Sequence, residues 1–248
     1  MGRAFEYRKA TKMARWSKMS KAFTKIGKEI TMAVKAGGPD PDSNLTLRRA
    51  MLNAKGANMP KDNVERAIKK ALGSDAKDYQ EVVYEGYGPG GVAILVETAT
   101  DNSTRTVANV RAIFNKHDGN LGTSGSLSFI FDRKGVFEIE ASQVEGKDFE
   151  ELELEFIDGG AEEVEKDDEM IMITTEYDDF GNMANKLEEL NIEAKSSGLK
   201  RFPTTMVNLT VEQAQPILKM LEKYEDDDDV QNVYHNMEMT DEIIAAMQ

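Results

Sequence analysis

The spacing of the apolar positions in this chain changes near residue 78. Before that point, apolar side chains recur at three- and four-residue steps in three stretches, residues 18–37, 47–56 and 60–73, and this spacing predicts three amphipathic helices. Glycine or Gly-Gly-Pro ends each stretch, as expected at the end of a helix. Three short amphipathic helices can bury one shared apolar seam, so we predict a helical domain over residues 1–78.

After residue 78 the pattern becomes typical of strands alternating with helices. Residues 135–202 show a complete β-α-β-β-α-β series, which is the order of a ferredoxin-like unit. The segments on either side of it have a similar order when they are taken together. The expected flanking elements are strands at 81–87, 92–100, 127–131, 205–209 and 230–237, and helices near 107–114 and 211–224.

The predicted fold class is therefore α+β, with an N-terminal three-helix domain followed by two ferredoxin-like α/β domains, one inserted into the other. Residues 79–133 and 203–248 would form a discontinuous ferredoxin-like domain. Residues 134–202 would form the inserted domain, which would leave the chain with three domains.

The charge of the chain is divided between two regions. Residues 1–72 hold 17 Lys and Arg against 6 Asp and Glu, a local net of +11, while the remaining residues have a net of −25 and the whole chain −14. A basic head on an acidic body predicts that polyphosphate is contacted by one end of the molecule. The alternative is that a basic helix docks on the acidic body.

The candidate nucleic-acid contacts lie mainly in this basic head. Residues 1–16 mix Arg and Lys with Phe5, Tyr7 and Trp16, and further lysines occupy the polar side of the helix predicted from residue 18. Guanidinium and aromatic planes in such an arm can stack on unpaired bases. The candidates are Arg3, Arg8, Lys9, Lys12, Arg15, Trp16, Lys18, Lys21, Lys25, Lys28, Lys55, Lys61, Thr123, Ser124 and Ser126.

Three glycine- or aspartate-rich segments need separate interpretation. Gly119–Ser126 carries glycines and hydroxyls between a helix and a strand, so it is either a phosphate-contacting loop or an ordinary connection. Gly86–Gly91 has the G-x-G-x-x-G spacing, but a strand follows it, which favours a turn over a dinucleotide site. Asp226–Asp229 is interpreted as a solvated turn before the last strand, because consecutive carboxylates diverge and hold a metal poorly.

The composition provides no support for an enzyme. There are no cysteines, the two histidines have no neighbours at metal-ligand spacing, and no nucleophile elbow or P-loop is present. No apolar run is long enough to span a bilayer, and the N-terminus has no apolar signal-peptide stretch. We expect a cytoplasmic protein that is not an enzyme, with no metal, no cofactor, no small-molecule substrate and no membrane partner.

Several runs together resemble the YebC/PmpR family, whose mitochondrial relative is a translational activator of cytochrome oxidase. The runs are 23–30, 54–63, 84–91, 100–107, 119–126 and 225–236. The resemblance spans nearly the whole chain and implies a helical first domain, two α/β domains and a role in gene expression. The opening Met1–Tyr7 departs from the family's usual Gly-His-Ser-Lys-Trp start, which bears on contacts carried over to those first residues.

Two functions follow as hypotheses. The first is a translation factor whose basic head enters ribosomal RNA, so that the expected partners are nucleic acid and the ribosome. The second is a DNA-binding transcriptional regulator, which is the family's traditional label. The first is favoured because the chain shows no helix-turn-helix signature and its body is too acidic to wrap duplex DNA.

Overall fold

The helical domain is built as its apolar spacing predicts. The structure is a computed structural model that describes residues 19–247, and its first described helices are α2 (Met19–Gly37), α3 (Leu45–Gly56) and α4 (Lys61–Ala71). Their shared core contains Ile30, Leu47 and Val64. Asn44 joins two of the helices, because its side chain accepts from the Leu47 amide at the start of α3 and donates to carbonyls at the end of α2.

The first sheet has four antiparallel strands in the order β3-β1-β2-β8. The strands are β1 (Gln80–Tyr87), β2 (Ala93–Thr100), β3 (Asn120–Leu121) and β8 (Val230–His235). Two helices, α5 (Ser103–Lys116) and α8 (Val211–Asp226), cover one face. The other face packs on Leu127, Ile130 and Phe131, so alternate residues of β2 are buried on both sides of the sheet.

The second sheet has the strand order β5-β6-β4-β7, which is that of a ferredoxin-like domain. Its elements are β4 (Phe131–Glu140), α6 (Phe149–Asp158), β5 (Ala161–Lys166), β6 (Met170–Glu176), α7 (Phe180–Glu189) and β7 (Ser196–Pro203). The core between the sheet and the helices contains Phe137, Phe156 and Met183. Short 3-10 turns lie at Pro89–Gly91 and Ala141–Val144, and a last helix, α9, spans Asp241–Ala245.

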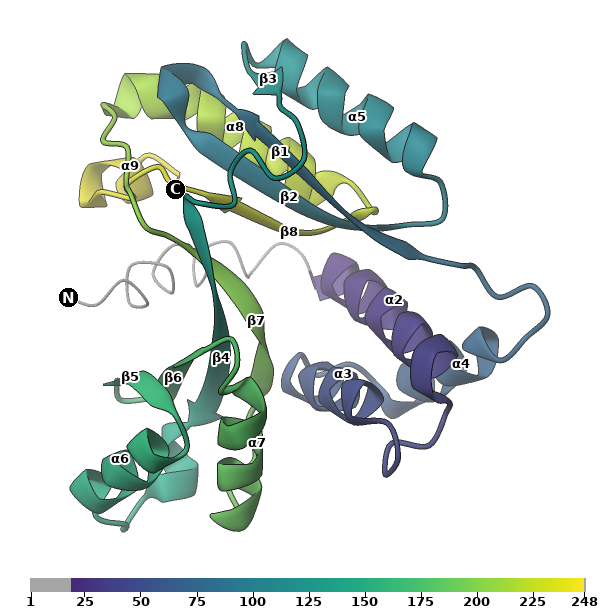
Figure 1. Ribbon diagram of the computed structural model, residues 1–248, viewed down its shortest axis with the longest axis vertical. Coiled ribbons are helices and arrows are strands. Elements are labelled where there is room, and N and C mark those ends of the chain that lie inside the picture. The colour runs from purple at the N-terminus through teal and green to yellow at the C-terminus, as the bar shows by residue number, and fades with distance from the viewer. Residues whose placement is uncertain (1–18, 248) are drawn as a thin grey trace.

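The helical domain, α2 to α4, lies beside both sheet domains. In Figure 1 the first sheet lies above, the second sheet below, and α2, α3 and α4 lie beside both. The second sheet is built entirely from residues 131–203, between the two parts of the chain that build the first sheet. This order agrees with the expected α+β fold; the division into separately folding domains at residues 134 and 203 stays a prediction.

Two expected strands are wrong. Residues 127–130 form consecutive turns, because the apolar side chains of Leu127 and Ile130 are three residues apart and both point under the first sheet. The segment 205–209 pairs through a single β-bridge, between Val207 and Met237, and forms no strand. The two edges of the first sheet are instead β8 and the short β3, which pairs with β1 through two residues.

The Gly86–Gly91 segment is a turn, as the following strand indicated. It connects β1 to β2 in an antiparallel hairpin, and Gly90 and Gly91 have φ angles of 70° and 75°. These are left-handed conformations that glycine adopts without strain. Helix α9 has no counterpart among the elements expected from the sequence.

Candidate nucleic-acid interface

Lys28 lies in the contact between α2 and the first sheet. Its Nζ donates to the carbonyl of Ala99 at 2.8 Å, to the carbonyl of Asp228 at 2.6 Å and to Oδ1 of Asp229 at 3.1 Å. The Tyr79 ring lies 5.1 Å from the same ammonium group. Lys28 is only 7% exposed, and its charge is compensated inside the protein by these partners.

Asp229 is the acceptor at the centre of this contact. Its second oxygen accepts from Arg105 at 2.7 Å, Thr106 at 2.9 Å and Thr100 at 3.2 Å. Burial alone would raise the pKa of the Asp229 carboxyl, but hydrogen bonds from Arg105, Lys28 and Thr106 lower that pKa below its usual range. The interpretation of Asp226–Asp229 as a solvated turn is therefore wrong for Asp229, which is 6% exposed because it pairs with cations far away in the sequence.

The neighbouring lysines of α2 also contact the body. Lys21 forms an ion pair of 2.5 Å with Asp226, and Nζ of Lys25 donates to the carbonyl of Gln231 at 3.0 Å. The lysine face of α2 is thus docked on the acidic body, as the alternative interpretation of the basic head held. Among the described candidates, Lys28 is buried, and Lys21 and Lys25 are engaged in this contact.

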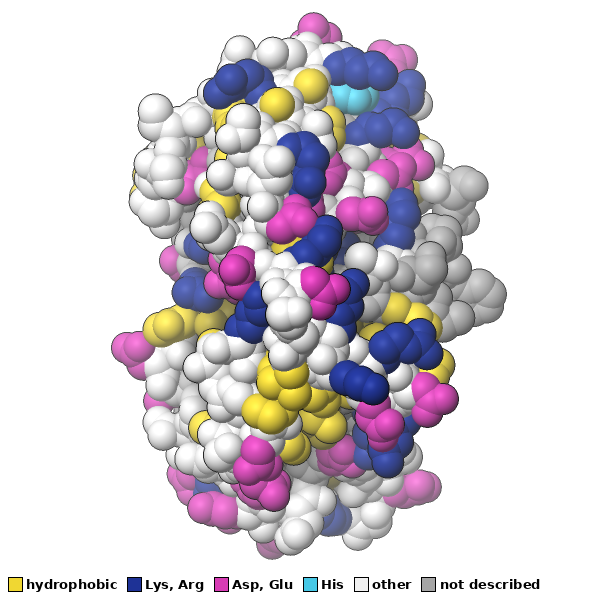
Figure 2. Space-filling model, turned by 90° about the vertical axis from the view of Figure 1, so that its right-hand side faces the viewer, with side chains coloured by type: hydrophobic (Ala, Val, Ile, Leu, Met, Phe, Trp, Pro, Cys, Tyr) yellow, Lys and Arg dark blue, Asp and Glu magenta, His cyan; other side chains and the backbone are white. Residues whose placement is uncertain are grey.

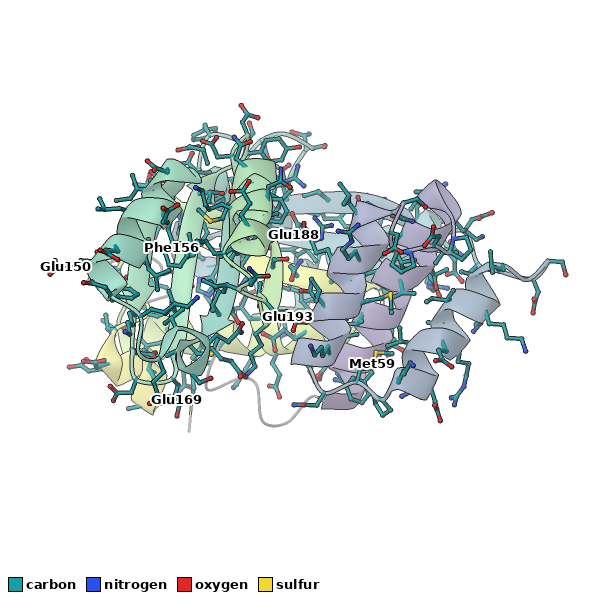
Figure 3. All side chains as sticks on the ribbon, turned by 90° about the horizontal axis from the view of Figure 1, so that it is seen from below. Met59, Glu150, Phe156, Glu169, Glu188 and Glu193 are labelled. Atoms are coloured by element: carbon teal, nitrogen blue, oxygen red, sulfur yellow. The ribbon has the colours of Figure 1, made fainter. Side chains whose placement is uncertain are left out.

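Helix α3 docks on the second sheet through its edge strand β7. The Asn53 side chain exchanges two hydrogen bonds with the backbone of Ser197, at 2.9 and 3.0 Å, so it imitates a neighbouring strand. Lys55 pairs with Glu193 at 2.6 Å and remains 70% exposed. Figure 3 shows Glu188 and Glu193 on the side of this sheet domain that faces α3. Arg48 reaches Glu188 at 3.8 Å.

Helix α4 carries the basic face that remains exposed. Arg66, Lys69 and Lys70 occur at three- and four-residue steps, which places them on one side of the helix, and all three are exposed. None of them forms an ion pair within residues 19–247. Lys61, on another side of α4, is 88% exposed and pairs only loosely with Glu65, at 3.7 Å.

These three α4 residues were not among the sequence candidates. The signal that could have found them is the charge order along α4, where Asp62 and Glu65 precede the three cations. The carboxylates therefore sit at the start of the helix and the cations at its end. In Figure 1, α4 lies on the outer side of the helical domain, away from both sheets.

A second group of cations lies on the acidic body, where none was expected. His117, at the end of α5, has Lys116 beside it in the chain and Lys219 and Lys223 near it on α8. Burial, and then these three lysines, lower the pKa of His117 below its usual range. Figure 2 shows lysine or arginine side chains bordering a histidine at the top of the molecule. The net charge of −25 for the body concealed this local group.

The Gly119–Ser126 segment is held by an internal carboxylate. Glu85, which is buried, accepts from the amide of Gly125 at 2.8 Å and from the amide of Leu127 at 2.6 Å. Ser126 contacts the same carboxylate at 3.5 Å. The amides of Gly125 and Leu127 therefore donate to Glu85 inside the protein. The side chains of Thr123 and Ser124 are exposed and remain candidates for contact.

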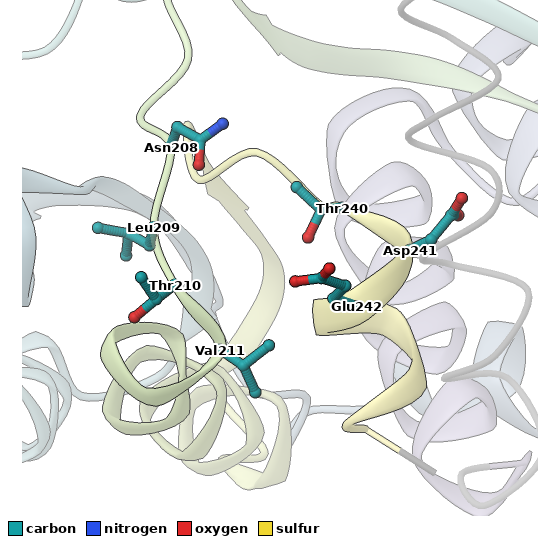
Figure 4. Close-up of a pocket in the computed structure, with 7 residues that line it drawn as sticks. All are labelled: Asn208, Leu209, Thr210, Val211, Thr240, Asp241 and Glu242. Carbon is teal, nitrogen blue, oxygen red and sulfur yellow. The ribbon is translucent and has the colours of Figure 1, made fainter.

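A hollow of about 470 Å³ lies between the starts of α8 and α9 (Figure 4). The side chains of Thr210 and Thr240 point to the amides of their own helices, accepting from Gln213 and Ile243. These amide groups are thus satisfied internally. Within residues 19–247 no group of three or more His, Cys, Asp or Glu side chains could hold a metal ion.

The candidates Arg3, Arg8, Lys9, Lys12, Arg15, Trp16 and Lys18 lie outside the described residues. The described part of the chain contains no helix long and apolar enough to cross a membrane. What the structure defines is a helical domain docked on two antiparallel α/β sheets, with an exposed basic face on α4.

Comparison with known proteins identifies the same class of fold and then the family. Residues 3–74 match the TACO1/YebC protein N-terminal domain, and residues 79–237 match the TACO1/YebC second and third domain. The chain belongs to the TACO1/YebC family, which confirms the resemblance found in the sequence.

Relatives and a solved structure agree with this assignment. A probable transcriptional regulatory protein of Parabacteroides distasonis is 55% identical, over 97% of this chain and 98% of its own length. One of the same description from Flavobacterium johnsoniae is 54% identical, over 96% and 99%. The crystal structure of a conserved hypothetical protein from Aquifex aeolicus superimposes with a TM-score of 0.78 at 41% identity, covering 92% of this chain and 94% of that one.

Proposed function

We propose that this protein is a nucleic-acid-binding regulator of gene expression that acts on the ribosome, with its helical domain in contact with ribosomal RNA. The observation that carries the proposal is the exposed basic face of α4, formed by Arg66, Lys69 and Lys70 without acidic partners in the described chain. Cations that are not compensated within the protein attract phosphate and release its counterions on binding.

The distribution of charge favours an RNA target that the head can enter from one side. Residues 1–72 have a net charge of +11 and the remaining residues −25, so a polyanion is attracted first to the helical domain, on whose outer side α4 lies (Figure 1). A duplex reader would need a recognition helix and a second half-site contact, and the sequence shows no helix-turn-helix signature. The proposal involves no catalysis, cofactor, metal or small-molecule substrate and assigns the protein to the cytoplasm.

The second candidate function is DNA-binding transcriptional regulation. It is favoured by the names of the bacterial relatives, which are called probable transcriptional regulatory proteins. Both functions use the same basic face, so the experiment must separate RNA from duplex DNA and not merely detect binding.

The test compares two charge-reversed variants in ribosome co-sedimentation at two salt concentrations, with duplex DNA as competitor. Lys69→Glu/Lys70→Glu removes two cations from α4. Lys147→Glu/Lys166→Glu makes the same change in net charge on exposed residues of the second sheet's domain. We expect binding to weaken only in the α4 variant, with the slope of log affinity against log salt reduced by about 0.7 for each phosphate that the variant no longer neutralises.

Two results would overturn the proposal. Equal co-sedimentation of the α4 variant and the unmodified protein would remove the helical domain from the interface. Tight binding to duplex DNA together with no ribosome binding would assign the protein to transcription instead.

A further inference from the structure

Two segments of this highly charged chain carry no charged side chain. They are residues 119–131 and 202–211, in a protein whose charged residues make up 31% of the sequence. The segments lie side by side: the amide of Thr204 donates to the carbonyl of Ile130 at 2.8 Å, and Phe131 pairs with Pro203 where β4 meets β7. The two uncharged segments therefore adjoin at Ile130–Phe131 and Pro203–Thr204.

Phe129 projects from the first of these two segments. Its side chain is 74% exposed, whereas its neighbours Leu127 and Ile130 are 0% and 9% exposed. The consecutive turns through the segment direct Leu127 and Ile130 under the first sheet and leave the ring between them facing outward. A phenylalanine in water forgoes the stabilisation that burial would provide, so the exposed ring offers an apolar face to a ligand.

The backbone that carries this ring is fixed. Glu85 anchors the segment through the amides of Gly125 and Leu127, and the Thr204 hydroxyl donates to the carbonyl of Ile130 at 3.1 Å. A ring on a fixed backbone loses little conformational freedom when a ligand stacks on it.

Several exposed hydroxyl side chains lie on the two segments. Thr123, Ser124 and Ser128 lie on the same segment, Thr204 and Thr205 on the adjoining one, and all are exposed. Serine is depleted at protein–protein interfaces, which are enriched in arginine and several aromatic residues. A flat aromatic face beside hydroxyl donors and acceptors suits an unpaired base, which stacks and presents hydrogen-bonding edges.

We propose that Phe129 is a stacking platform for an unpaired base of single-stranded RNA, with the flanking hydroxyls contacting the base or its sugar. The inference rests on the proposed function and adds to it a contact on the body, separate from the α4 face. It also makes single-stranded RNA, and not a duplex, the form of nucleic acid that the body accepts.

The test measures binding of the full chain to two RNA oligonucleotides of equal length, one unstructured and one abasic, which have the same phosphate charge. Phe129→Ala should weaken binding to the base-containing RNA by about 5- to 150-fold, the effect of removing one stacked base, and leave the abasic RNA unchanged. Phe129→Trp should retain binding. Leu154→Ala is the matched control, since Leu154 is an apolar side chain 64% exposed on the other sheet domain.

The Lys69→Glu/Lys70→Glu variant separates this inference from the proposed function. The α4 variant should weaken binding to both RNAs. If Phe129→Ala then weakens binding to neither RNA, or to both equally, the stacking platform is refuted and the role of α4 stands. If the unmodified protein binds neither RNA, both proposals fail. If Phe129→Ala leaves RNA binding intact but releases a protein neighbour in crosslinked ribosomes, the surface is a protein interface and the inference is wrong.

Discussion

Replacing Lys28 with methionine tests whether the lysine face of α2 is structural. Methionine keeps most of the length and apolar volume of the lysine stem but removes the ammonium group. The substitution deletes three hydrogen bonds from Nζ, to the carbonyls of Ala99 and Asp228 and to Oδ1 of Asp229, in a site where both charged side chains are 8% exposed.

The magnitude follows from what remains around Asp229. Removing one partner of a buried ion pair costs about 3–5 kcal/mol when the other charge is left uncompensated. Here Arg105 still donates to Asp229 at 2.7 Å and Thr106 at 2.9 Å, so the remaining carboxylate keeps partners. We therefore expect a decrease at or below the lower end of that range, about 2–3 kcal/mol of unfolding free energy.

Lys21→Met is the control, because it removes the same charge from the same face of α2. Its ion pair with Asp226 has side chains 36% and 38% exposed, and an exposed pair contributes about 0–1 kcal/mol. The assay is urea denaturation of the full chain, followed by circular dichroism and by hydrogen exchange of the α2 amides. A double-mutant cycle with Asp229→Asn isolates the pairwise contribution.

The reasoning is refuted if Lys28→Met costs no more than Lys21→Met. In that case Lys28 would not be buried against the sheet, and the lysine face of α2 would return to the set of nucleic-acid contacts. The division between α2 and α4 is supported if Lys28→Met is clearly less stable than Lys21→Met. RNA binding by the Lys28 variant should then be unchanged when it is measured without urea, below the melting temperature of that variant.

Three further predictions concern stability. His235 has no hydrogen-bond partner for Nδ1 in the described chain, and burial lowers its pKa to about 4. The unfolded chain therefore binds a proton at His235 below about pH 6.5, whereas the native state does so only near pH 4. The free energy of unfolding is thus constant above about pH 6.5 and decreases by about 3 kcal/mol toward pH 4. The melting temperature measured as a function of pH should show this decrease, and His235→Gln should reduce it. Gly56→Ala would place a Cβ 1.9 Å from the Lys195 carbonyl, so it should separate α3 from β7 and lower the melting temperature, whereas alanine at the open position Gly27 should not. Excision of residues 134–202 with a short Gly-Ser bridge should leave a cooperatively folding protein, because the excised part has its own core; a non-cooperative melt would count against the domain boundaries.

Much of the local structure could be predicted from spacing alone. The apolar steps over residues 18–37 correspond to α2, and the β-α-β-β-α-β order corresponds to the second sheet domain. Both patterns report which side of an element is buried, and that is set by residues close together in the chain. The same rule misread residues 127–131, since a short apolar run does not distinguish a strand from packed turns.

The candidate site was harder to predict for the same physical reason. Periodicity showed that the polar side of α2 carries lysines, but a polar side can face either water or a carboxylate distant in sequence. Lys28 and Asp229 are 201 residues apart, and nothing near either residue in the chain indicates the other. Arg66, Lys69 and Lys70 were not predicted, because nothing in the sequence distinguishes these exposed cations from the lysines of α2.

The sequence by itself determined the α+β class, the order of most elements, the family and the separation of a basic head from an acidic body, because composition, periodicity and motif order are properties of the chain. Only the tertiary structure decided which charges are exposed. In the folded chain Lys28 and Asp229 are buried against each other, and Arg66, Lys69 and Lys70 are on the surface. The Glu85 carboxylate accepts from the amides of Gly125 and Leu127, and Phe129 faces outward. Each of these depends on a contact between residues far apart in the chain, and such contacts exist only once the fold has formed.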